Sequence, residues 1–140
     1  MSSMNSLLNA VVIALVVCVL GYSFLGPREA PPPPNDAAFN AAIQQPGLVL
    51  VKFGAEWCPP CRFVDGELNR LTAAGKPAVH VVKINVDQNQ SLAAHYRVSS
   101  IPRLILFRDG KQVDDRTGGM GLEQLQAWLS GYARSSQQVQ

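Results

Sequence analysis

The chain has 140 residues, which suits one small domain with an appendage. Only 16% of the residues are charged, the net charge is +2, and Lys and Arg are scattered along the chain. This pattern argues against nucleic-acid binding, which needs a clustered basic surface, and no acidic or basic tail is present. Of the three cysteines, Cys18 lies in an apolar run, and Cys58 and Cys61 enclose too short a loop to act as a structural staple.

A short tail, residues 1–6, precedes an uncharged apolar run from Leu7 to Leu25. This run is close to the roughly 20 residues that a membrane-spanning helix needs. Tyr22 and Phe24, near its end, suit a membrane interface. We expect a signal-anchor helix, because the run exceeds the usual signal-peptide core of about 7–15 residues and no Lys or Arg precedes it.

Two alternatives to an anchor are weaker. A cleaved signal would use the A-x-A-like site that ends at Ala30, but Pro31 follows it and is a poor context for a signal peptidase. A lipoprotein site at Cys18 would need a small residue before the cysteine, where Val17 stands.

Residues 26–34 form a Pro-rich linker that contains four successive prolines. Such a run favours the extended polyproline II conformation, at about 3.1 Å per residue. We expect a stiff spacer between the membrane and a domain over residues 35–134. A proline-rich ligand for another domain is the alternative.

Helix and strand signals alternate through the domain. In the segment 60–74, for example, the apolar residues Phe63, Val64, Leu68 and Leu71 recur at the spacing of one face of a helix. The expected elements are a helix capped by Asn35 or Asp36 and stopped at Pro46-Gly47, a strand at 48–53, a helix at 60–74 stopped by Gly75, a strand at 78–86, a short helix at 90–98, a hairpin at 103–118 that turns at Asp109-Gly110, and a helix at 121–133. This order implies an α/β fold, a mixed central sheet flanked by helices on both faces, followed by a disordered tail at 135–140.

Cys58 and Cys61 stand where the strand at 48–53 gives way to the following helix. A helix N-terminus offers unpaired N–H groups and a partial positive charge, and both favour a thiolate over a thiol. Cys58, at the loop edge, is the candidate nucleophile, and Cys61, one turn later, is the candidate resolving thiol. Pro60 suits the first helical turn, which needs no backbone N–H there.

Metal and haem sites are weaker interpretations of this cysteine pair. A structural zinc site normally has four ligands, and the only histidines, His80 and His95, show no ligand spacing. Covalent c-type haem needs His directly after the second cysteine, where Arg62 stands. We expect no metal and no cofactor other than a redox-active disulfide between Cys58 and Cys61.

The segment "FGAEWCPPCR" resembles the active-site segment of the thioredoxin family. The resemblance continues through "VVKINVDQN", "YRVSSIPRLILFRDGKQV" and "RTGGM", and covers about Asp36 to Ala133. It implies the thioredoxin fold and a thiol–disulfide oxidoreductase activity. In this family, Ile101-Pro102 matches a cis-proline that faces the cysteines and helps to bind extended substrate backbone. Further matches are Trp57, beside the cysteines, Gly118, which lines the substrate groove, and Lys83 and Asp87.

Three departures from the family pattern stand out. The family's buried carboxylate, taken to relay protons for the second cysteine, aligns with Lys52, which would favour the thiolate, lose its charge on burial, or extend to the surface. Glu56 is a candidate substitute for it, and Lys83 is a further candidate for tuning the charge. The dipeptide between the two cysteines is Pro59-Pro60, where the family usually has Gly-Pro, and this dipeptide tunes the redox potential. Pro59 also removes a backbone N–H that could reach a sulfur. The family's first strand falls on the proline run and is expected to be absent.

These features predict a membrane-tethered thiol–disulfide oxidoreductase that reduces disulfides of exported proteins. Cys58 attacks the substrate disulfide, and Cys61 then displaces the reduced substrate. A groove around Trp57, Ile101-Pro102 and Gly118 holds the substrate as an extended segment. An oxidase or isomerase that donates its disulfide is the alternative, which Pro59 favours, whereas Ile101 favours reduction. A non-catalytic binding module is the alternative of another class, and the presence of both cysteines argues against it.

The expected partners follow from this function. Protein disulfides are the substrates, with apocytochrome cysteines and mis-oxidised exported proteins as examples. No nicotinamide or flavin motif is present, so a membrane thiol reductase is the expected electron donor. We expect a monomeric, single-pass inner-membrane protein whose domain lies on the periplasmic side, although Arg28, just after the apolar run, weakly opposes this orientation.

Overall fold

The computed structural model describes residue 9, residues 11–17 and residues 36–135. The chain divides into two compact units, Met1–Pro31 and Pro32–Gln140, and each is described by itself. In the first unit, residues 11–17 are helical and their side chains are exposed. No helix among the residues described here is long and apolar enough to cross a membrane. Most of the expected anchor at 7–25, the linker at 26–34, and the tails at 1–6 and 136–140 lie outside the described residues.

Four strands form one mixed sheet, as the thioredoxin resemblance predicted, and their order in the sheet is β2-β1-β3-β4. Central strand β1 runs parallel to β2 and antiparallel to β3, and β3 continues through a tight turn into antiparallel β4. Within residues 36–135 no strand precedes β1, so the sheet has four strands. The strands are β1 (Leu48–Gly54), β2 (His80–Asn85), β3 (Arg103–Arg108) and β4 (Lys111–Thr117).

Four helices cover the sheet, and local capping sets several of their ends. Helix α2 (Ala37–Ile43) begins after Asp36, whose carboxylate accepts a hydrogen bond from the Phe39 backbone N–H at 3.0 Å. Helix α3 (Pro59–Ala74) ends at Gly75, which has φ 66°, a left-handed conformation that glycine adopts without strain. The other two helices are α4 (Gln90–His95) and α5 (Leu122–Ser135), and α5 includes Ser135, which was expected to begin the tail.

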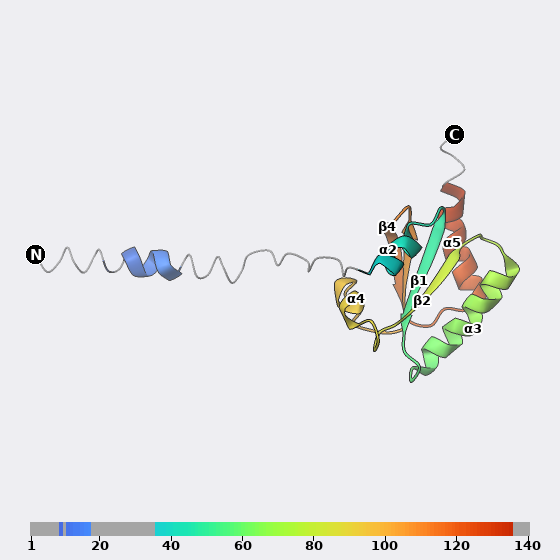
Figure 1. Ribbon diagram of the computed structural model, residues 1–140, viewed down its shortest axis with the longest axis horizontal. Helices are drawn as coiled ribbons and strands as arrows, with labels where there is room; N and C mark the ends of the chain where they lie inside the picture. Colours follow the sequence, from blue (N-terminus) through green and yellow to red (C-terminus); the bar gives the residue numbers. More distant parts are fainter. Residues whose placement is uncertain (1–8, 10, 18–35, 136–140) are drawn as a thin grey trace, which may run out of the picture. The chain divides into compact units, whose positions relative to one another are not determined.

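The helices form two layers, with α3 and α5 on one face of the sheet and α2 and α4 on the other (Figure 1). Strand β1 is buried along its whole length, and its side chains alternate between the two cores. Val49, Val51 and Phe53 pack with α2 and α4, whereas Leu48 and Leu50 pack with α3 and α5. This alternation directs Lys52 toward the α3 face, among apolar neighbours.

Two carboxylates tie α5 to the rest of the domain. Glu67 of α3 accepts a hydrogen bond from the Leu122 backbone N–H at 2.7 Å, and this bond is the main reason that the pKa of Glu67 lies below its usual value. Asp114 of β4 accepts hydrogen bonds from the Trp128 indole at 2.7 Å and the Tyr132 hydroxyl at 2.8 Å. Trp128 therefore packs against the core on the α3 and α5 face and also bonds to β4.

Candidate active site

The cysteine pair lies at the junction between β1 and α3. Cys58 is the N-cap of α3, with φ −98° and ψ 104°, and Pro59 and Pro60 occupy the first helical turn. The Cys61 backbone N–H donates a hydrogen bond to Cys58 Sγ at 3.3 Å. This N–H and the helix dipole both stabilise negative charge on the Cys58 sulfur, which is the property a nucleophilic thiolate needs.

Cys58 and Cys61 form a disulfide, with their Cα atoms 5.2 Å apart. The Cα separation lies in the usual range of about 4.4–6.8 Å, so the helix start holds the two residues at bonding distance. Cys61 is fully buried, and only 4% of Cys58 is exposed. The nucleophile is thus less exposed in the disulfide form than its position at the loop edge suggested.

The residues expected to line a substrate groove are linked to the disulfide or to the segment beside it by packing, chain adjacency and hydrogen bonds. Ile101 packs against the disulfide, and the Ile101–Pro102 peptide bond is cis, as predicted. Gly118, with φ 99°, donates its backbone N–H to the Pro102 carbonyl at 2.9 Å. Trp57 is 68% exposed, and its indole N–H donates to Asp87 Oδ2 at 2.9 Å.

Phe63 adds an exposed aromatic ring that the sequence pattern had assigned to the helix core. Val64, Leu68 and Leu71 are fully buried, whereas Phe63 is 55% exposed. Its ring lies near Gly119, since Cδ1 is 3.9 Å from the point that a Cβ atom on Gly119 would occupy. Phe63 therefore borders the loop that follows β4, next to Gly118.

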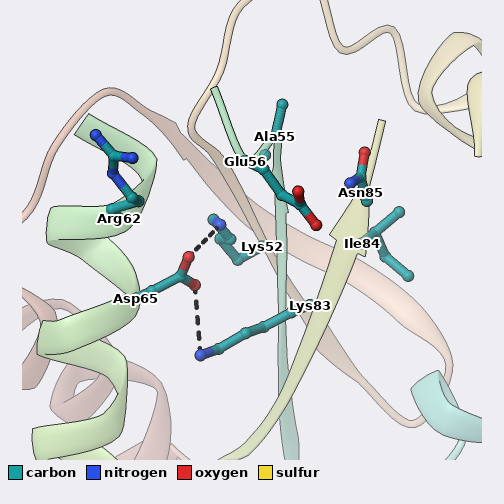
Figure 2. Close-up of a pocket in the computed structure, with 9 residues that line it drawn as sticks. Lys52, Ala55, Glu56, Arg62, Asp65, Lys83, Ile84 and Asn85 are labelled. Atoms are coloured by element: carbon teal, nitrogen blue, oxygen red, sulfur yellow. Dashed lines mark hydrogen bonds and ion pairs between the residues drawn. The ribbon is translucent and has the colours of Figure 1, made fainter. Parts of the chain in front are cut away.

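A second group of polar residues lies in a pocket lined by residues of β1, α3 and β2. Lys52 is only 5% exposed, and its Nζ lies 2.9 Å from Asp65 Oδ2. Lys83 Nζ lies 3.4 Å from the other oxygen of Asp65. Figure 2 shows the Asp65 carboxylate between the two lysines. Lys52 is therefore buried in an ion pair and does not extend to the surface. Glu56, the expected substitute carboxylate, lines the same pocket from an exposed position.

Asp65 is the polar residue that sequence analysis did not identify. It comes from α3, four residues after Cys61, and residues at this spacing share one face of a helix. That spacing was the available signal, but a lone Asp in a helix is a common surface residue. Its partner Lys52 lies 13 residues earlier, on β1, so the pair forms only when α3 packs on the sheet.

The end of Lys52 and the sulfur of Cys61 both lie close to Gly54. A Cβ atom on Gly54 would stand 2.6 Å from Lys52 Nζ and 3.2 Å from Cys61 Sγ. The ammonium and the sulfur are therefore separated by no more than the sum of these distances. Because Gly54 has no side chain, nothing from this residue stands between the two groups.

The two histidines belong to elements other than β1 and α3, which carry the cysteine pair. His80 begins β2, and His95 ends α4. Across residues 36–135 and the short N-terminal helix, no group of three or more His, Cys, Asp or Glu side chains could hold a metal ion.

The comparisons with known proteins agree on one family. Residues 32–131 match the family model of thioredoxin. Thioredoxin from Alicyclobacillus acidocaldarius subsp. acidocaldarius is 42% identical over 96 residues, which cover 69% of this chain and 91% of that protein. Thioredoxin from Porphyra purpurea is 38% identical over 99 residues, which cover 70% and 92% of the two chains.

Solved structures give the same result. A mutant thioredoxin from Halobacterium salinarum NRC-1 superposes with a TM-score of 0.63 at 34% identity, over 68% of this chain and 82% of that one. The oxidised thioredoxin from Plasmodium falciparum superposes with a TM-score of 0.61 at 26% identity, over 69% and 90% of the two chains.

Proposed function

This chain belongs to the thioredoxin family and is a thiol–disulfide oxidoreductase, and we propose that it acts as a membrane-tethered reductase of disulfides in exported proteins. The observation that carries the proposal is the Cys58–Cys61 disulfide at the start of α3, packed against the cis Ile101–Pro102 peptide. A dithiol in this position can donate two electrons to a substrate disulfide and close on itself.

The reaction proceeds in two exchange steps. The Cys58 thiolate attacks one sulfur of the substrate disulfide, which breaks the substrate S–S bond and releases one substrate thiolate. Cys61 then loses its proton, attacks Cys58 Sγ and displaces the second substrate thiolate. Both leaving thiolates take up protons from solvent, so the substrate is reduced and the Cys58–Cys61 pair is oxidised.

The surface around the disulfide suits an extended protein segment. Trp57 and Phe63 offer exposed aromatic faces on the two sides of the cysteine pair in the sequence. Pro102 and Gly118 are joined by a backbone hydrogen bond, and Ile101, which precedes Pro102, packs against the disulfide. Such a surface binds main chain and apolar side chains of many sequences, which fits protein disulfides as a substrate class.

Two observations support the tether. The side chains at residues 11–17 are all apolar, and the large ones are 49–64% exposed. The match to thioredoxin begins at residue 32, so the apolar segment is an addition to the family domain. We propose that residues 7–25 anchor the chain, that the domain is periplasmic, and that a membrane thiol reductase resupplies electrons.

A topology experiment tests the location. Alkaline phosphatase fused after Gln140 should be active if the domain is exported, and a green fluorescent protein fused at the same place should then be dark. Deletion of residues 7–25 should release the protein from the membrane fraction. Fluorescence of the second fusion would contradict the exported domain.

An oxidase or isomerase is the second candidate, because one observation favours it. The buried Lys52 ammonium lies beside Cys61 and favours the reduced, thiolate form, which makes a disulfide more oxidising. The reduction potential of the detergent-solubilised full chain, equilibrated in dithiothreitol or glutathione buffers, separates the candidates. A value near −270 mV supports a reductase, and one between about −180 and −120 mV supports disulfide donation. A pair that forms no reversible disulfide would indicate a binding module.

A further inference from the structure

Lys52 is a buried charge in a strand whose other side chains are apolar. It is 5% exposed, and an isolated ammonium at this depth would destabilise the fold strongly. Its ion pair with Asp65, at 2.9 Å, offsets that cost. Replacement of a buried ion pair by apolar residues is often neutral or even stabilising, so stability alone does not explain the pair.

The direction in which Lys52 points suggests a role in the reaction. Its ammonium lies beside Gly54, and Cys61 Sγ lies beside the same residue. An opposite charge within about 4–6 Å favours the charged form of a titratable group. In the reduced protein the ammonium is therefore close enough to stabilise a thiolate on Cys61, which is otherwise fully buried.

From this arrangement we propose that Lys52 is the charge partner of the Cys61 thiolate in the resolving step and that Asp65 positions its ammonium. The inference rests on the proposed thiol–disulfide exchange. Three other charged side chains line the pocket: Lys83 from β2, Glu56 from the loop after β1, and Arg62 from α3. Asp65 also contacts Lys83, but that lysine is 43% exposed and its charge is screened by solvent.

The pocket connects the Lys52 ammonium and the Asp65 carboxylate with solvent. It has a volume of about 520 Å³, is open at the surface, and is lined by Lys52, Gly54 and Asp65. Figure 2 shows Lys52 and Asp65 facing each other in it. In the resolving step the Cys61 proton passes to solvent, and the Lys52 ammonium balances the charge left on sulfur. The thiolate attacks Cys58 Sγ, the new S–S bond forms, and the bond between Cys58 and the substrate sulfur breaks. The substrate thiolate carries away the electron pair and takes a proton from solvent.

A titration of Cys61 tests the proposal. We would use the full chain in detergent with Cys18→Ser and Cys58→Ser, so that Cys61 is the sole thiol and the new hydroxyl at the start of α3 keeps a favourable N-cap. The resonance of isotope-labelled cysteine Cβ is followed against pH. Lys52→Met should raise the titration midpoint of Cys61 by about one to three pH units, because the opposite charge is lost.

Lys83→Met is the matched control, since it removes the same charge from the same carboxylate at an exposed position. It should shift the midpoint by less than a third as much as Lys52→Met. Equal shifts in the two variants, or no shift in either, would overturn the proposal. Lys52→Gln, which keeps a hydrogen-bond donor toward Asp65, gives the same test if Lys52→Met fails to fold.

A double-mutant cycle tests the positioning role of Asp65. If Asp65 holds the ammonium beside Cys61, Lys52→Met should have less than half of its effect when Asp65→Ala is already present. An undiminished effect would show that Lys52 holds its place without Asp65.

The pH profile of the resolving step separates this role from a structural one. With Cys58 present, Lys52→Met should slow resolution at neutral pH by about tenfold for each unit by which the midpoint rises, and recover near the wild-type rate at alkaline pH. Slow resolution at every pH would indicate a packing defect. If wild-type protein forms no reversible Cys58–Cys61 disulfide, the proposed function fails; if it does and Lys52→Met titrates unchanged, only this inference fails.

Discussion

The indole N–H of Trp57 donates a hydrogen bond to Asp87 Oδ2 at 2.9 Å, and this bond ties the residue before Cys58 to the turn after β2. Trp57 is 68% exposed, so packing alone holds its ring weakly. The bond joins two segments separated by 30 residues and orients an aromatic face beside the disulfide. Asp87 therefore orients Trp57, which belongs to the proposed substrate surface.

We predict that Asp87→Ala raises KM for a protein disulfide about two- to fivefold, the equivalent of an exposed hydrogen bond of roughly 0.5–1 kcal/mol. Stability should change little, because both side chains are at the surface. Insulin reduction, with Trp57 fluorescence as a second signal, measures the effect. Trp57→Phe keeps an aromatic ring but removes the N–H. In the Trp57→Phe background, Asp87→Ala should therefore cause no further rise in KM. Additive effects of the two changes would exclude the bond as their common cause.

Asp114 links β4 to α5 and makes the stability of the domain depend on pH. Burial is the largest influence on its carboxyl and acts to raise the pKa, but hydrogen bonds from Trp128, Tyr132 and the Asp115 backbone, with the charge of Arg116, together lower it. A lowered pKa means that the folded state binds the proton less tightly than the unfolded chain. The charged Asp114 therefore stabilises the fold at pH values above 3.8, the pKa of this carboxyl in the unfolded chain. This stabilisation is lost as the pH falls through the lower pKa of Asp114 in the folded protein.

We predict that Asp114→Asn reduces the free energy of unfolding near neutral pH by about 1–3 kcal/mol, as expected when hydrogen bonds to a charged group are weakened. The difference from wild type should shrink as pH falls below about 4, where Asp114 of the wild type becomes protonated. Urea unfolding across this pH range measures both. Asp109→Asn, in the exposed β3–β4 turn, is the control. A difference that stays constant with pH would show that the charge of Asp114 contributes nothing.

Much of the fold followed from local patterns. The predictions from the apolar run at 48–53 and the stripe of Val64, Leu68 and Leu71 are confirmed, because β1 is buried on both faces and α3 on one. The cysteine pair was identified because its spacing and its place between a strand and a helix lie within one short segment. The Lys52–Asp65 pair was missed as a pair, because it depends on how α3 docks on the sheet. Phe63 was assigned to the core because periodicity alone cannot resolve the edge of a helical stripe.

Phe63 is the second exposed aromatic side chain near the disulfide, after Trp57. It is 55% exposed, and its ring borders Gly119. We predict that Phe63→Ala raises KM for protein disulfides about three- to tenfold, because an apolar contact area is lost from the substrate surface. The rate with a small disulfide, such as oxidised glutathione, should stay near that of wild type.

Val113→Ala serves as its control. Val113 of β4 is 38% exposed and lies away from the cysteine pair in the sheet order, so its loss should leave KM unchanged. Equal effects of Phe63→Ala on insulin and on the small disulfide would show that Phe63 affects the cysteines and not the binding of protein substrates.

Gly54 allows the Lys52 ammonium to approach Cys61, because it has no side chain. The substitution Gly54→Ala should therefore displace the ammonium from Cys61 without removing its charge. A Cβ atom at this position would stand 2.6 Å from Lys52 Nζ and 2.7 Å from Cε, so the end of the lysine must turn away. The cost is limited because a lysine tip is flexible and the adjoining pocket has room for it. The contact with Cys61 Sγ, at 3.2 Å, is tight and adds some strain.

We predict that Gly54→Ala raises the titration midpoint of Cys61 in the same direction as Lys52→Met, with a loss of about 1–3 kcal/mol in stability from overpacking. In the Lys52→Met background, Gly54→Ala should shift the midpoint no further, because no charge is left to displace. Gly66→Ala, in the interior of α3 with no atom within 4 Å of the new methyl group, is the control. It should stabilise the helix by about 0.5–1 kcal/mol and leave the titration of Cys61 unchanged. A shift from Gly54→Ala that persists without Lys52 would mean that strain at the sulfur, and not the displaced ammonium, sets the acidity of Cys61.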